Sequence, residues 1–271
     1  MKQIVLLLAL AFLLCGCVDG VGEKLPERVT EAHESLTETL PPAELVPQAP
    51  TPGQGQAVFS ILENDDSIRN GAGDVLVKIC YEQVVLDTSV PRWQNINDCI
   101  RGDYLRFAEE MAWLKETSVR DWESQITGMG SVYGSLLSVA SAEVTNNSGG
   151  LFSVRMTRDW FLGGVFNSDH YGMTFDLDTG KPVELGELSE RSREEFAAQL
   201  KQTVCDSLAR DWDALSEDPA LVLAEYTLED FQFYIEGGEL VLTFPTYTFG
   251  PGAMGAVTVR TGLYPELQQK K

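Results

Sequence analysis

The stretches LFSVRMTRDWF (residues 151–161) and YGMTFDL (residues 171–177) place apolar side chains at about every second position. This period is typical of β-strands that bury one face. Asp178, Thr179 and Gly180 follow directly and predict a turn. The centre of the chain is therefore predicted to form a β-sheet, and the flanking segments decide what packs on it.

Two flanking segments have the three- and four-residue spacing of amphipathic helices. In the later one, Ser192 and Glu195 have the spacing of a capping box, which satisfies amides of the first helical turn. The apolar positions that follow are Phe196, Leu200, Val204, Leu208 and Trp212. The apolar positions of the earlier one are Ile96, Ile100, Tyr104, Phe107, Met111 and Leu114. Both segments are predicted to be helices with one buried face.

Shorter apolar or alternating runs complete the predicted strands. They cover residues 56–62, 74–82, 135–144, 231–236, 239–244 and 256–260. The order of strands, helix, strands, helix and strands predicts an α+β fold, with antiparallel sheets packed with two main helices. We predict two sequential subdomains, a first α+β subdomain at residues 53–148 and a C-terminal one at residues 149–271.

The first residues, MKQIVLLLALAFLLCGC, predict export from the cytoplasm. The apolar run 4–14 is too short to cross about 30 Å of hydrocarbon, but it suits a signal peptide after Lys2. Residues 14–17, Leu-Cys-Gly-Cys, resemble a bacterial lipobox. We therefore predict a lipoprotein signal peptide at residues 1–16 and a lipid on Cys17, which would anchor the protein at the extracytoplasmic face of a bacterial cell membrane. Ordinary secretion without a lipid is the alternative.

Residues 17–52 are predicted to be a Pro/Glu-rich tether. Six of the twelve prolines of the chain fall in this segment, and large apolar residues are scarce. Such a composition buries too little apolar area to offset the entropy lost on ordering. An extended Pro-rich chain rises about 3.1 Å per residue, so the tether can hold the domain roughly 100 Å from the membrane. A helical spacer around residues 22–40 is the alternative.

The charge excludes two classes of partner. The 271 residues include 20 Lys+Arg and 41 Asp+Glu, for a net charge of −21. Removal of residues 1–16 takes away Lys2 and no acid, so the net charge becomes −22. Nucleic acid and anionic lipid are not expected as direct partners, because both repel an acidic surface.

The residues that bind metals are scarce. Two His, and cysteines without metal-ligand spacing, predict no metal site, and no cofactor is predicted. Cys80 and Cys99 are the candidate disulfide pair in an extracytoplasmic protein, and free thiols are the alternative.

The motifs of the chain indicate no catalytic class. GPGAMG at residues 250–255 matches GxGxxG, but a strand is predicted after it where a dinucleotide site needs a helix, so it is interpreted as a turn. No GxSxG, HExxH or P-loop pattern occurs. The carboxylates of Glu184, Glu187 and Glu190 are interpreted as a solvated face rather than a glycosidase pair. We therefore predict no catalytic residue and no enzyme activity.

One acidic segment around a histidine provides the candidate ligand contacts. They are His170, Tyr171, Asp176 and Asp178. A histidine among carboxylates can act as a general base or bind a ligand. The alternative is an ordinary loop residue beside an acidic turn.

Several stretches between residues 73 and 267 resemble one known family of extracytoplasmic domains. They are Ile96-Asn97 with Ile100, Leu151–Val154, the run Phe161-Leu162-Gly163-Gly164, YGMTFDLDTGK at residues 171–181, and LVLTFPTYTFG at residues 240–250 with Gly255 and Val257. The chain thereby resembles the extracytoplasmic region of the RsiV-type anti-sigma factors and the amino-terminal module of PdaC-type peptidoglycan deacetylases. After the two glycines that family often continues Ala-His, whereas this chain has Val165-Phe166.

The resemblance implies an α+β binding module at the cell envelope. In the anti-sigma proteins the module recognises lysozyme, and this binding exposes them to proteolytic signalling. A lipoprotein signal is predicted here in place of their cytoplasmic segment and membrane span, so direct sequestration of a sigma factor is not expected. Deacetylation is not implied either, because that enzyme's separate catalytic domain is missing.

Three functions remain open. The first is a lipid-anchored, non-catalytic binding or sensing module, with lysozyme or another basic protein as partner; opposite charge would steer such a protein inward. Peptidoglycan fragments are further candidate ligands. The second is a peptidoglycan-acting enzyme that uses carboxylates such as Asp176, Asp178 or Glu184. The third is a structural envelope lipoprotein that binds another envelope protein.

Overall fold

The computed structural model describes residues 55–69, 71, 73, 75–129, 136–161, 165–209 and 215–265. The predicted signal peptide, the lipid site Cys17 and the tether lie outside these residues. The strands are β1 (Phe59–Asp65), β2 (Ile68–Arg69), β3 (Val75–Leu86), β4 (Leu136–Ser148), β5 (Leu151–Phe161), β6 (Asn167–Asp176), β7 (Lys181–Pro182), β8 (Gln232–Glu236), β9 (Glu239–Phe244) and β10 (Val257–Arg260). The α-helices are α1 (Gln94–Met129), α2 (Arg193–Leu208) and α3 (Pro219–Val222), and the 3₁₀ turns are η1 (Pro91–Trp93), η3 (Leu185–Leu188), η5 (Leu228–Asp230) and η6 (Gly252–Met254).

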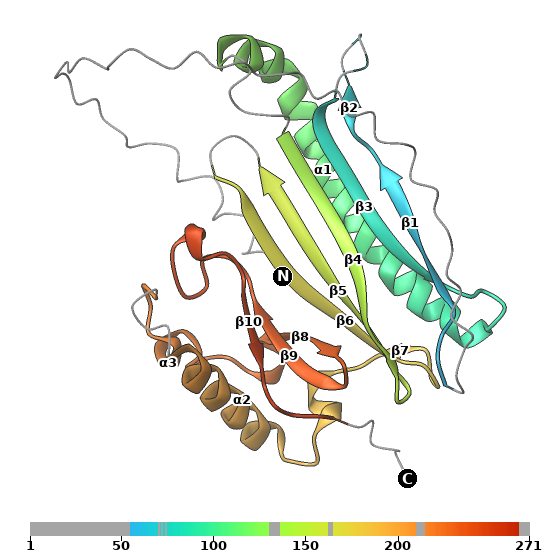
Figure 1. Cartoon of the computed structure of the whole chain (residues 1–271), viewed down its shortest axis with the longest axis vertical. Helices are drawn as coiled ribbons and strands as arrows, with labels where there is room; N and C mark the ends of the chain where they lie inside the picture. The colour runs from blue at the N-terminus through green and yellow to red at the C-terminus, as the bar shows by residue number, and fades with distance from the viewer. Residues whose placement is uncertain are drawn as a thin grey trace, which may run out of the picture. The chain divides into compact units, whose positions relative to one another are not determined.

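The strands form two sheets, and the predicted α+β class is confirmed. A seven-stranded sheet has the order β1-β3-β4-β5-β6-β7, with β2 beside β3, and a three-stranded sheet has the order β10-β9-β8 (Figure 1). Neighbouring strands are antiparallel except β3 and β4, which pair in parallel. Parallel pairing needs a long crossover connection, and α1 provides it.

The long hairpin of β4 and β5 joins the two predicted subdomains. Its turn is Gly149-Gly150, with φ of 62° and 77°. Two successive residues of positive φ give the tight hairpin turn whose twist matches the strands, and glycine adopts this conformation without strain. The seven-stranded sheet therefore takes strands from both sides of the predicted boundary at residues 148 and 149.

Helix α1 covers one face of the large sheet (Figure 1). The predicted apolar positions Ile96, Ile100, Phe107 and Met111 are buried in one core cluster with sheet residues such as Ile79 and Phe152. The helix continues past the predicted stretch to Met129. It begins after η1, where the buried Trp93 donates its indole N–H to the carbonyl of Leu177 at 3.1 Å.

Helix α2 and the small sheet enclose a second core cluster. Phe196, Leu200, Val204 and Leu208 are buried there, as their spacing predicts, together with Leu240 and other β9 side chains. The predicted capping box is present: Ser192 Oγ accepts from the amide of Glu195, whose carboxylate accepts from the amide of Ser192. The fifth predicted position, Trp212, lies outside the described residues.

The small sheet packs on the face of β5 and β6 that is turned away from α1. A Cβ at Gly172 in β6 would lie 1.9 Å from the carbonyl oxygen of Phe233 in β8, so the two backbones are in direct contact. Ser153 Oγ accepts from the amide of Ile235 at 2.9 Å, and Thr243 Oγ1 donates to the carbonyl of His170 at 3.0 Å. These polar contacts hold the two sheets together.

The candidate disulfide is not formed: Cys80 and Cys99 are free thiols. Neighbouring residues of a strand point to opposite faces of a sheet. Tyr81 reaches α1, where its hydroxyl bonds Asp103, so Cys80 points away from the helix that carries Cys99. Its thiol lies instead 3.9 Å from Asp65 Oδ1, and burial raises its pKa.

Candidate functional site

The four candidate contact residues are not brought together. His170 and Tyr171 are successive residues of β6, so their side chains lie on opposite faces of the sheet. Asp176 follows His170 by six residues on the same strand, and this corresponds to roughly 20 Å between their backbones at the usual strand rise. The acid–histidine segment of the sequence therefore does not form a single site.

Tyr171 belongs to a polar cluster under α1. Its hydroxyl donates to Asp103 Oδ2 at 2.6 Å, and the hydroxyl of Tyr81 donates to the same oxygen at 2.7 Å. Arg106 pairs with the other carboxylate oxygen at 2.8 Å. The side chain of Asp103 is only 13% exposed, and the pKa of both tyrosines is raised, first by burial and then by the Asp103 charge. Both phenols therefore stay protonated and act as donors that fix α1 on the sheet.

Sequence reasoning missed Asp103, although the helix pattern contains a signal for it. The residue lies three positions after Ile100 and four before Phe107, both of which are buried. Positions three and four apart share a helix face, so Asp103 is an acid on the buried stripe. A buried carboxylate needs hydrogen-bond partners, and this requirement points to the tyrosines of the sheet.

His170 lies on the opposite face, where it is half-buried. Its Nδ1 is 3.0 Å from Thr157 Oγ1 on the paired strand β5. The pKa of His170 is lowered, first by burial and next by the charge of Arg155. The imidazole is therefore neutral at pH 7, since its ordinary pKa is already about 6.5.

The two acids form the predicted turn rather than a cleft. Asp176 Oδ1 accepts from the amide of Asp178 at 2.8 Å, and its Oδ2 accepts from Thr179 Oγ1 at 2.8 Å. The carboxylate of Asp178 is exposed at the tip of this turn. Both carboxylate oxygens of Asp176 thus accept hydrogen bonds that stabilise this turn.

A surface that the sequence did not single out lies at the start of β6. Val165, Phe166 and Tyr247 are 60%, 53% and 60% exposed, and we call these three residues the aromatic patch. Tyr247 comes from the loop between β9 and β10, and its hydroxyl bonds Asn167 Oδ1 at 3.2 Å. The same Asn167 donates to the carbonyl of Val165 at 3.2 Å. Asn167 therefore connects the two segments of the patch.

The β9–β10 loop holds Tyr247 in a fixed position. Tyr247 has a φ of 74°, a left-handed conformation that costs a non-glycine residue roughly 1–2 kcal/mol. Its ring lies against Gly252, where a Cβ would come within 2.4 Å of the tyrosine hydroxyl. The preceding Thr246 donates its amide to Asp169 Oδ1 at 2.6 Å and its hydroxyl to the carbonyl of Ser168 at 3.0 Å.

The GPGAMG segment is part of this same loop. It forms the short 3₁₀ turn η6 between β9 and β10, so the interpretation as a turn between strands is confirmed. Its glycines serve two purposes in the loop: Gly252 admits the tyrosine ring, and Gly255 has a φ of 72°. The motif thus presents an aromatic side chain to solvent.

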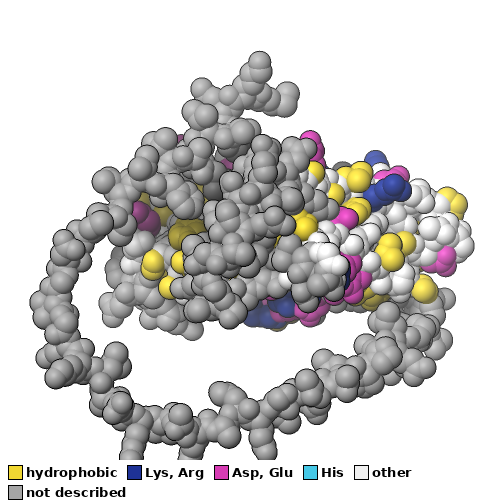
Figure 2. Space-filling model, turned by 90° about the horizontal axis from the view of Figure 1, so that it is seen from above, with side chains coloured by type: hydrophobic (Ala, Val, Ile, Leu, Met, Phe, Trp, Pro, Cys, Tyr) yellow, Lys and Arg dark blue, Asp and Glu magenta, His cyan; other side chains and the backbone are white. Residues whose placement is uncertain are grey.

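The charged side chains of the described surface are mixed with apolar ones, as Figure 2 shows for one face. In the described part of the chain, six arginines form ion pairs with acids: Arg69, Arg106, Arg155, Arg158, Arg193 and Arg260. With twice as many acids as bases in the sequence, the remaining acids give the surface its negative charge.

Within the described ranges, no three His, Cys, Asp or Glu side chains come together in a way that could hold a metal ion. None of the helices described there is long and apolar enough to cross a membrane.

The architecture is that of an α+β protein with an exposed, structurally fixed aromatic surface. Residues 184–260, from the start of η3 to the end of β10, match the family DUF3298, described as a protein of unknown function. No curated protein matches the chain.

A solved structure shows the same fold. The chain is similar to a member of the DUF3298 family from Bacteroides fragilis, with a TM-score of 0.54 and 13% identity over 77% of this chain and 91% of that one. A DUF3298 family protein from Pseudomonas aeruginosa has a TM-score of 0.47 and 15% identity, over 77% of this chain and 92% of that one. The family match and the Bacteroides structure are consistent with the resemblance to the RsiV-type region, and that finer relation stays a prediction.

Proposed function

We propose that the protein is a non-catalytic binding or sensing module that is anchored by a lipid on Cys17 at the extracytoplasmic face of a bacterial cell membrane. Its partner would be a basic protein of the envelope or the host, with lysozyme as the first candidate. The single observation that carries the proposal is the aromatic patch, in which Val165, Phe166 and Tyr247 are exposed and Asn167 connects the Val165 carbonyl to the Tyr247 hydroxyl.

The geometry of the patch supports binding rather than a structural role. Tyr247 has a strained backbone conformation although its side chain is 60% exposed, and strained residues of this kind cluster at functional sites. Exposed aromatic side chains that are already fixed lose little entropy on association and are enriched among the residues that dominate interface energies.

The charge supports a basic partner. A net charge of −21 attracts a cationic protein over about 10 Å at moderate salt and raises its association rate. The apolar contact would then supply the part of the affinity that salt does not remove. The negative charge and the aromatic patch together favour a basic protein as the ligand over a small cation.

The hydrogen bonds of the candidate catalytic carboxylates favour a role without catalysis. Asp176 accepts hydrogen bonds within its own turn, and Glu184 belongs to the capping box of η3. Glycoside hydrolysis uses two carboxyl groups that flank the scissile bond, and these two carboxylates are instead engaged in local hydrogen bonds.

Calorimetric titration tests the proposal. Both core clusters consist of residues between Ala57 and Val259, so the chain without residues 1–17 retains them. This chain is titrated with lysozyme, and with a second small basic protein as the control, at low and at physiological salt. We expect saturable binding to lysozyme that persists at physiological salt and is absent with the control. Binding to both proteins that salt abolishes would reduce the interaction to general charge attraction, and no binding would exclude lysozyme.

A further inference from the structure

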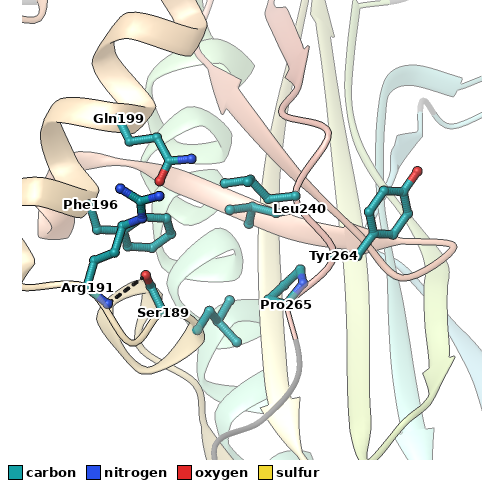
Figure 3. A pocket seen from close by; sticks show the side chains of 9 residues that line it. Ser189, Arg191, Phe196, Gln199, Leu240, Tyr264 and Pro265 are labelled. Atoms are coloured by element: carbon teal, nitrogen blue, oxygen red, sulfur yellow. Dashed lines mark hydrogen bonds between the residues drawn. The ribbon is translucent and has the colours of Figure 1, made fainter.

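A small pocket borders the second core cluster, and it shares no residue with the aromatic patch. Its volume is about 200 Å³. The lining residues come from the end of η3 and the link that follows it, the first turns of α2, β9, and the segment after β10. Figure 3 shows Arg191 and Gln199 on one side and Leu240 and Pro265 facing them.

The bottom of the pocket is apolar and rigid. Leu188, Phe196 and Leu240 are buried members of the second core cluster. The far wall is attached to the sheet, since the amide of Leu240 donates to the carbonyl of Leu263 at 2.8 Å. A ligand group that enters here meets a preformed apolar surface.

The rim carries an unpaired positive charge. The guanidinium of Arg191 has no hydrogen-bond or ion-pair partner among the described residues, although the chain has 41 acids. Its backbone is fixed, because its amide donates to Ser189 Oγ at 3.2 Å and the capping box of α2 begins at the next residue. The side-chain amide of Gln199 lies beside it and offers a second donor (Figure 3).

These features define the ligand chemistry. A planar guanidinium binds a carboxylate through two parallel hydrogen bonds, and the apolar bottom suits a small aliphatic group next to that carboxylate. The volume is below the roughly 300–1,000 Å³ of pockets for drug-sized ligands, so it holds the end of a chain rather than a whole large molecule. We propose that the pocket binds the free carboxyl-terminal residue of a peptide that ends in a small apolar amino acid, with Arg191 on the carboxylate.

Two sources supply such an end: the L-residue at the terminus of a protein and the D-residue at the terminus of a peptidoglycan stem peptide. Both present the same carboxylate beside a methyl group. The probes are therefore N-acetyl-L-Ala-L-Ala, N-acetyl-D-Ala-D-Ala, and the corresponding carboxamides as controls. A probe of this size is expected to bind with a dissociation constant of about 1 mM.

The experiment is an NMR titration of the chain without residues 1–17 with each probe, and the variant is Arg191→Gln. The matched control is Arg101→Gln. Arg101 is also exposed, its guanidinium has no hydrogen-bond or ion-pair partner among the described residues, and it lies on α1, which packs on the first core cluster. Both variants remove one positive charge from a side chain that makes no hydrogen bond or ion pair in the described structure. We therefore expect both variants to have the wild-type free energy of unfolding.

We expect at least one of the two free acids to shift the resonances of pocket residues, and its carboxamide to bind at least tenfold more weakly. Arg191→Gln should weaken binding of the acid at least tenfold, and Arg101→Gln should leave it within twofold. The preferred stereoisomer identifies the source. Equal binding of acid and carboxamide, equal binding by Arg191→Gln and wild type, or no shift at 10 mM of either acid would overturn the proposal. None of these results depends on whether lysozyme binds.

Discussion

The two faces of β6 are held to their neighbours by different forces. On one face Tyr171, Met173 and Phe175 pack into the core under α1, where apolar burial dominates. On the other face, the backbone of Gly172 is in direct contact with Phe233 of the small sheet. Thr174 shares a hydrogen bond of 2.8 Å with Ser153 on β5, and Ser153 Oγ accepts in turn from the amide of Ile235 in the small sheet. The comparison shows that one strand can combine two kinds of contact. One is an apolar core contact with a hydrogen bond from Tyr171 to Asp103, and the other is a close backbone contact that leaves no room for a side chain.

The largest predicted effect is that of a single methyl group at Gly172. Gly172→Ala places its Cβ 1.9 Å from a backbone oxygen, which no side-chain rotation relieves, so we expect a loss of about 3 kcal/mol in the free energy of unfolding. The control is Gly102→Ala on α1, where nothing lies within 4 Å, and helix propensity predicts a gain of about 0.5–1 kcal/mol. Urea denaturation measures both. If Gly172→Ala unfolds like the wild type, the sheets are not in direct contact.

The next effect concerns the polar cluster on the other face. Asp103→Ala leaves the hydroxyls of Tyr81 and Tyr171 without their acceptor, and we expect a loss of about 3 kcal/mol. Tyr171→Phe removes one hydrogen bond without burying an unsatisfied donor, so about 1 kcal/mol is expected. The same denaturation experiment compares them. A larger loss for Tyr171→Phe than for Asp103→Ala would contradict the arrangement.

The smallest effect is a pH dependence from His170. Because the pKa of His170 is lowered in the folded state, the unfolded state binds the proton more tightly than the folded state does. The contribution of the neutral imidazole to the free energy of unfolding is therefore complete above about pH 6.5 and decreases as the pH drops towards the folded-state pKa. Between pH 8 and 5.5 the wild type should therefore lose more thermal stability than His170→Gln. The chain has one other histidine, His33, and His33→Gln should keep the wild-type dependence. Parallel profiles for wild type and His170→Gln would place the imidazole in solvent.

The buried faces of the main strands and helices were predictable from the sequence. The periods of 151–161 and of the helix that begins at Ser192 correspond to β5 and α2, because burial of one face repeats at a fixed spacing. The parallel β3–β4 pair and the contact at Gly172 were not predictable in this way. They depend on how distant segments meet in space, and periodicity carries no information on that.

The candidate site was predicted less well for a related reason. Adjacent letters suggested a group at His170, Tyr171 and Asp176, but strand geometry separates neighbours to opposite faces. The aromatic patch instead brings together two distant segments, which are connected by the hydrogen bond between Asn167 and Tyr247, 80 positions apart. The GxGxxG segment contained part of the signal, since only a residue without a side chain leaves room for the Tyr247 ring at position 252.

The most direct test of the binding account compares two surface variants in calorimetry with lysozyme at physiological salt. The first variant combines Phe166→Ser and Tyr247→Ser in the aromatic patch. The second, Leu221→Ser, removes an apolar side chain that is 74% exposed on α3. We predict at least tenfold weaker binding for the patch variant and wild-type affinity for Leu221→Ser. Wild-type affinity of the patch variant, with lysozyme bound, would contradict the assignment of this surface as the binding site.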